Sequence, residues 1–104
     1  DGTIAGYLAQ GGHGCISVTA NVAPRLTSML HHYWQKKNYK EFDKVNLKLA
    51  PLSKILFVEP SPTPAKYALS LMGKCSSEVR SPLTDLSTDT KKQIKKIIKS
   101  LKFI

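Results

Sequence analysis

The feature that most constrains the fold is a single candidate β-strand, residues 15–18 (Cys-Ile-Ser-Val) of the 104-residue chain. Glycines precede it at positions 11, 12 and 14, and the Thr-Ala-Asn of residues 19–21, typical of a helix start, follows it. One strand has no ladder for its N–H and C=O groups, and unpaired backbone groups are costly when they are buried. The segment therefore predicts that the chain is part of a larger fold.

The rest of the chain has the periodicity of amphipathic helices, with apolar residues three and four positions apart. We expect Asn21 to be an N-cap and Pro24 to lie in the first turn of the helix that follows the strand. Helices are expected over residues 3–10, 21–37, 39–58, 64–72 and 89–101, with Pro51 inside the third and Gly73 ending the fourth. Packing among the last three is expected through Phe42, Leu49, Ile55, Leu71, Ile94 and Ile98.

The formal net charge is +9, and much of it comes from the lysines of residues 91–102. Ile94 and Ile98 belong to an apolar stripe on the expected helix, so we expect these lysines to cover its opposite, solvated face. A contact with nucleic-acid phosphates or a membrane surface stays open as the alternative, although no aromatic or arginine side chains are interleaved with the lysines. The sequence has neither a transmembrane-length apolar run nor a secretory leader, which predicts a cytoplasmic protein.

Candidate catalytic groups are weak when each is taken alone. His13 precedes Ser17, but neither a glycine-flanked nucleophile motif nor an acidic third member accompanies them. His31 and His32 are adjacent on an expected helix, so their side chains diverge by about 100 degrees and do not share one face as metal ligands would. The sequence therefore predicts neither a metal site nor a hydrolase.

Two further groups have ordinary structural interpretations. Cys15, inside the expected strand, is interpreted as a small buried hydrophobe, with a nucleophile as the less common alternative. Glu59 is expected to cap or pair in its loop, with acid–base chemistry as the less common role. Cys15 and Cys75 are expected to be free thiols because two cysteines do not make a disulfide framework in a reducing compartment.

Three stretches resemble the dihydrodipicolinate synthase family of pyruvate aldolases in order and spacing. They are residues 11–24 (GGHGCISVTANVAP), residues 51–69 with LFVEPSPTPAKYAL at their end, and residues 80–87 (RSPLTDLS). The resemblance covers nearly the whole chain and implies the C-terminal third of a (β/α)8 barrel. Residues 1–37 would be helix 7, strand 8 and helix 8 of that barrel, and residues 38–104 an appended helical region. The fold class implied is α/β, in a segment that is itself mostly α.

The resemblance also implies an activity. The family condenses pyruvate with aspartate semialdehyde through a Schiff base on a lysine, in lysine and diaminopimelate biosynthesis. That lysine would lie upstream of Asp1, so no catalytic residue is assigned here. Ile16 matches the isoleucine whose backbone carbonyl contacts bound pyruvate. Serines replace the usual Asn at Ser61 and the usual Leu at Ser81.

The same resemblance implies a homo-oligomer, a dimer or a tetramer, that uses no cofactor and binds neither nucleic acid nor a membrane. Two other interpretations stay open. One is a structural segment that is inactive by itself, and the other is a basic interaction module that uses the face from Lys91 to Lys102. Isolated from its barrel, the chain is expected to self-associate through its unpaired strand and helix faces.

Overall fold

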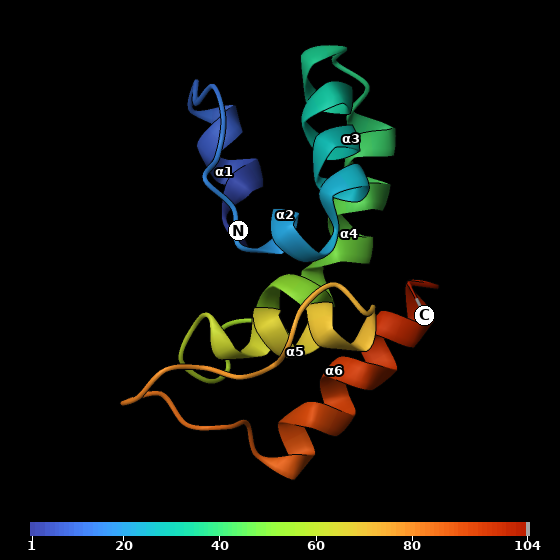
Figure 1. The fold of residues 1–104 in the computed structure, drawn as a ribbon. Helices are drawn as coiled ribbons and strands as arrows, with labels where there is room; N and C mark the ends of the chain where they lie inside the picture. The colour runs from blue at the N-terminus through green and yellow to red at the C-terminus, as the bar shows by residue number, and fades with distance from the viewer. Residues whose placement is uncertain (104) are drawn as a thin grey trace.

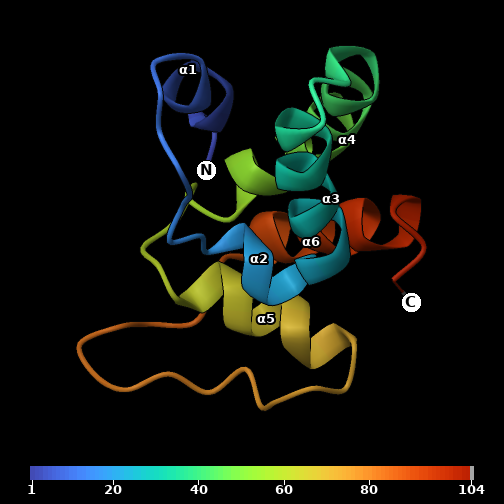
Figure 2. The ribbon, with the colours of Figure 1, turned by 90° about the horizontal axis from the view of Figure 1, so that it is seen from above.

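The computed structural model describes residues 1–103, and within them the regular structure is entirely helical. Helices α3 and α4 pack side by side, and α5 packs on α6. Helix α1 stands apart from the α3 and α4 pair, and α5 and α6 lie below that pair in the view of Figure 1 (Figures 1 and 2). Their bounds are α1 Ile4–Ala9, α2 Thr19–Val22, α3 Pro24–Gln35, α4 Tyr39–Ile55, α5 Thr63–Leu71 and α6 Thr88–Ser100. The helices expected from periodicity are therefore present, with ends shifted by a few residues.

The strand expected over residues 15–18 does not form in the described chain. Residues 12–17 have no regular structure, and Val18 already has helical backbone angles, φ −73° and ψ −42°. A strand needs a neighbouring strand to pair its backbone N–H and C=O groups, and residues 1–103 contain no second strand. Cys15 is exposed as a result, so its interpretation as a buried hydrophobe is wrong for this structure.

The expected N-cap at Asn21 is also wrong. Asn21 lies inside α2, and its side-chain amide donates to the carbonyls of Ser17 and Val18 at 3.3 Å and 3.2 Å. The break between α2 and α3 falls at Ala23, whose backbone has φ −127° and ψ 64°. Proline disfavours helical angles in the residue before it, so Pro24 ends α2 and becomes the first residue of α3.

Helix α4 is central to the core, since it packs against both α3 and α6. Its N-cap Asn38 accepts a hydrogen bond from the Glu41 amide, and Pro51 lies within the helix without ending it. Trp34 of α3 meets Phe42 edge-on, with ring centroids 5.2 Å apart. The largest fully buried side chains are Leu52, Leu56, Pro64, Ile94 and Ile98.

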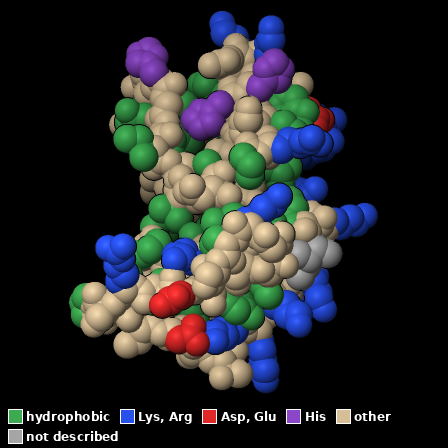
Figure 3. All heavy atoms as spheres, in the orientation of Figure 1, with side chains coloured by type: hydrophobic (Ala, Val, Ile, Leu, Met, Phe, Trp, Pro, Cys, Tyr) green, Lys and Arg blue, Asp and Glu red, His purple; other side chains and the backbone are tan. Residues whose placement is uncertain are grey.

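Helix α6 is amphipathic as expected. Ile94 and Ile98 are fully buried, and the lysines between and beyond them are mostly exposed. Figure 3 shows Lys and Arg side chains along the edge of the molecule that α6 occupies. Lys91 forms a salt bridge with Asp85, with 2.6 Å between Nζ and Oδ2, and its ammonium group lies 5.6 Å from the centre of the Tyr67 ring. Among residues 1–103 no helix has the length and apolar character needed to cross a bilayer.

Candidate functional site

The sequence-predicted site residue, Ile16, lies on the irregular segment between α1 and α2. Its side chain is fully exposed, at 107% of the reference area. Ile16 lines an open hollow of about 500 Å³ together with Asp1 and Cys15 and with residues of α1 such as Tyr7. In the isolated chain the candidate pyruvate segment therefore faces solvent on this side.

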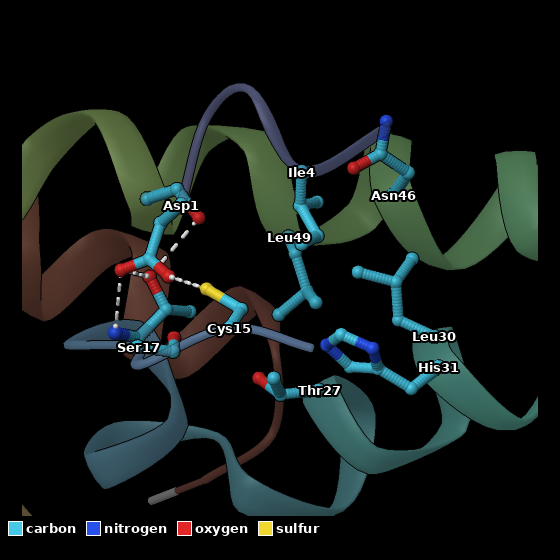
Figure 4. Close-up of a pocket in the computed structure, with 11 residues that line it drawn as sticks. Asp1, Ile4, Cys15, Ser17, Thr27, Leu30, His31, Asn46 and Leu49 are labelled. Carbon is cyan, nitrogen blue, oxygen red and sulfur yellow. Dashed lines mark hydrogen bonds between the residues drawn. The ribbon is translucent and has the colours of Figure 1, made fainter. Parts of the chain in front are cut away.

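Asp1 fixes the far end of this segment. One carboxylate oxygen, Oδ2, accepts three hydrogen bonds, from the Val18 amide (3.0 Å), the Thr19 amide (3.0 Å) and the Thr19 hydroxyl (3.1 Å). The other oxygen, Oδ1, is 3.8 Å from the Cys15 sulfur (Figure 4). A carboxylate near the first amides of a helix is favourable in charge and satisfies donors that the helix leaves unpaired. The Ser17 hydroxyl accepts from the Ala20 amide at 3.0 Å and satisfies another.

A small cavity lies behind Asp1, between the irregular segment and helices α3 and α4 (Figure 4). Its volume is about 20 Å³, and Thr27, His31 and Asn46 are among the polar residues that line it. The Thr27 hydroxyl is buried and has no hydrogen-bond partner within the part of the chain that is described. The cavity is water-sized, too small for an organic substrate.

The histidines and the serine considered from sequence do not assemble into a catalytic group. His13 and His32 are exposed, while His31 is half-buried against the small cavity. Histidine side chains are separated from one another on the face that Figure 3 shows. Within residues 1–103 no three His, Cys, Asp or Glu side chains are grouped closely enough to hold a metal ion. Ser17 is a helix cap.

Glu59 has the capping role expected of it. Its carboxylate accepts from the Ser87 amide at 3.3 Å and lies 3.2 Å from the Ser87 hydroxyl, at the start of α6. The Thr90 hydroxyl, followed by these Ser87 groups, lowers the pKa of Glu59 below its ordinary value. A depressed pKa suits a structural carboxylate that stays charged, whereas a general acid needs a raised one. Cys15 and Cys75 are both free and exposed.

Neither Asp1 nor Thr27 is marked as a site residue by any local pattern in the sequence. The signal for Asp1 is long-range, since its partners are 17 and 18 positions away, and no local motif marks such a cap. Thr27 looks like any polar helix residue in sequence. Its hydroxyl becomes buried only when the chain folds.

Solved structures contain this arrangement at the end of a barrel enzyme. The chain superimposes on the dihydrodipicolinate synthase of Thermotoga maritima with a TM-score of 0.95 and 37% identity, covering 99% of this chain and 35% of that one. The chloride-inhibited dihydrodipicolinate synthase of Acinetobacter baumannii, complexed with pyruvate, gives a TM-score of 0.91 and 34% identity, with shares of 99% and 35%. The fold is thus that of the C-terminal third of a (β/α)8 barrel protein.

The sequence relatives of the chain belong to the same family as these structures. The 4-hydroxy-tetrahydrodipicolinate synthase of Bradyrhizobium diazoefficiens is 50% identical over 91 residues, which are 88% of this chain and 31% of the relative. That of Rickettsia prowazekii is 46% identical over 101 residues, 97% and 34% respectively. A model of the dihydrodipicolinate synthetase family matches residues 1–101. The chain belongs to the dihydrodipicolinate synthetase family and spans about a third of the length of these relatives.

Proposed function

We propose that this chain is the C-terminal part of a lyase that condenses pyruvate with aspartate semialdehyde to 4-hydroxy-tetrahydrodipicolinate, in lysine and diaminopimelate biosynthesis. The observation that carries the proposal is the match of nearly the whole chain to dihydrodipicolinate synthases, one of them complexed with pyruvate. Residues 1–37 would complete the barrel and residues 38–104 form the helical region behind it. We also propose that the enzyme is a cytoplasmic homo-oligomer.

The chemistry would be divided between the two parts of the barrel. A lysine amine upstream of Asp1 would attack the pyruvate ketone and lose water to give an imine, without any cofactor. The residue proposed to line the pyruvate site from this chain is Ile16, through its backbone carbonyl, an acceptor that is present whatever the side chain is. Support for this role comes from its place on the irregular segment, beside the open hollow.

The division can be tested by trapping the imine. A complete barrel is made by placing the upstream part of the Rickettsia prowazekii relative before Asp1. With pyruvate and borohydride, the complete barrel should gain one adduct, since hydride reduces the imine to a stable amine. The isolated chain should remain unmodified, and its many exposed lysines serve as the internal control. A stoichiometric adduct on the isolated chain, or none on a folded complete barrel, would contradict the proposal.

The role of Ile16 has its own test. In the complete barrel, Ile16→Val keeps the main-chain carbonyl and nearly the same shape, so pyruvate affinity should stay within about fivefold of the parent, because one methylene is worth about 1 kcal/mol or less. The matched control is Val18→Ile, which makes the reverse change two residues away. A stable Ile16→Val protein that no longer binds pyruvate would refute a backbone-only role.

A further inference from the structure

The Asp1 carboxylate joins both ends of the segment that carries Ile16. Oδ1 faces the Cys15 sulfur, just before Ile16, and Oδ2 accepts from the amides of Val18 and Thr19, just after it. The intervening residues have no helix or strand to hold them. Asp1 is therefore the side chain that brackets the proposed pyruvate contact, as Figure 4 shows for Asp1 and Cys15.

The same contacts continue into the C-terminal helical region. The Thr19 hydroxyl lies 3.1 Å from Asp1 Oδ2 and 3.1 Å from the hydroxyl of Ser53 on α4. An ionised carboxylate accepts only, so the single Thr19 hydroxyl proton goes to Asp1, and Ser53 must donate to Thr19. The chain of hydrogen bonds therefore has one direction, from Ser53 to Thr19 to Asp1.

This relay is placed where it can be effective. Thr19 is 2% exposed and Ser53 is 9% exposed, so water competes little for either hydroxyl. Hydrogen bonds to a charged acceptor are stronger than those between neutral groups, and an abandoned buried donor is costly. Three donors meet on one oxygen of Asp1, so its loss would free all three together.

We propose that Asp1 is a positioning residue, which, with Thr19 and Ser53, fastens the Ile16 segment to helix α4 and thereby sets the direction of the Ile16 carbonyl. The inference rests on the proposed function for its consequence, since the carbonyl matters only if pyruvate binds there. It gives the C-terminal helical region a task in substrate binding that neither its packing nor its charge indicates.

The first measurement uses this chain and needs no activity. Amide hydrogen exchange at residues 18 and 19 and the carbonyl ¹³C shift of Ile16 are followed by NMR. Asp1→Ala should speed exchange at both amides by about tenfold or more, because a tenfold change corresponds to 1.4 kcal/mol and charge-assisted bonds are worth that much. Asp1→Asn keeps an acceptor oxygen and should restore most of the protection. Asp43→Ala, which removes an exposed carboxylate on α4, is the matched control.

The second measurement uses the complete barrel. Asp1→Ala should raise the KM for pyruvate by about tenfold and change kcat by less than about threefold, because a displaced carbonyl weakens binding without touching the reacting lysine. Ser53→Ala should raise KM by a smaller factor. The double variant should match Asp1→Ala alone, since both act through Thr19.

The outcomes separate the two proposals. The positioning role is overturned if Asp1→Ala leaves KM unchanged, or if it changes KM and kcat no more than the control Asp43→Ala does. Either result leaves the proposed lyase function unaffected. Unchanged exchange at residues 18 and 19 overturns it as well. A folded complete barrel that forms no pyruvate adduct refutes the proposed function instead, and the exchange data still decide whether Asp1 orders the segment.

Discussion

Replacing Ile16 by alanine should have little effect on the stability of the isolated chain and a large effect on that of the complete barrel. The isolated chain leaves the Ile16 side chain fully exposed, so its removal takes no apolar area out of a core. Exposed substitutions usually change the free energy of unfolding by no more than about 0.5 kcal/mol. If Ile16 becomes part of the eighth barrel strand, the same change deletes a buried side chain and should cost about 2 to 5 kcal/mol.

Leu52→Ala provides the internal standard for this comparison. Leu52 is 0% exposed at the centre of the core, so its truncation should cost about 2 to 5 kcal/mol in both proteins. For a domain of about 100 residues, each kcal/mol corresponds to roughly 4 to 8 °C in Tm. Leu52→Ala should therefore lower the Tm of the isolated chain by at least about 8 °C, while Ile16→Ala should leave it within about 4 °C.

The assay is urea and thermal unfolding followed by far-UV circular dichroism, at two protein concentrations. Two concentrations are needed because self-association would bury Ile16 in the isolated chain and make its stability concentration-dependent. A loss of more than about 2 kcal/mol for Ile16→Ala in a dilute monomer would show that the side chain is packed, contrary to the structure. No loss in the complete barrel would show that residue 16 does not enter a buried strand.

Three other measurements follow from the structure. Thr27→Val should raise the stability of the chain by about 1 kcal/mol, since it removes a buried hydroxyl without a partner, and a comparable loss would show that the hydroxyl is hydrogen-bonded in solution. The pKa of Glu59 is lowered, first by the Thr90 hydroxyl, so the charged carboxylate stabilises the folded state. This contribution to the free energy of unfolding is fully present above the ordinary glutamate pKa of about 4.3 and is lost as the pH falls through the lowered pKa. Glu59→Gln should accordingly flatten the acid limb of stability against pH, and an unchanged limb would contradict the cap. Amide hydrogen exchange should show strong protection in the helices beyond residue 39 and weaker protection over residues 1–22, unless the chain assembles. Uniform protection along the chain in a dilute monomer would contradict this expectation.

Amphipathic periodicity by itself determined most of the helices. The spacing of Phe42, Leu49 and Ile55 put one stripe on α4, and Ile94 and Ile98 put another on α6, and all five are buried in the structure. Leu71, expected beside them, is only half-buried. Helix periodicity is a local property, so it can be read without knowing what covers the stripe.

Residues 11–24, together with residues 51–69 and 80–87, indicated the family and the candidate contact at Ile16, because the order of residues in a motif can be compared without knowing the fold. The secondary structure of the same stretch could not be predicted correctly. Residues 15–18 have the composition of a strand, but a strand needs a neighbour, and residues 1–103 do not contain one.

Only the tertiary structure decided the role of Asp1. Its hydrogen bonds reach Val18 and Thr19, and through Thr19 they reach Ser53, 34 positions farther along the chain. Each of these residues is unremarkable in sequence, since a carboxylate and two hydroxyls carry no periodic signal. They become a single hydrogen-bonded unit because Thr19 and Ser53 are both buried in the folded chain, so that water competes little and each hydroxyl has the other as a partner.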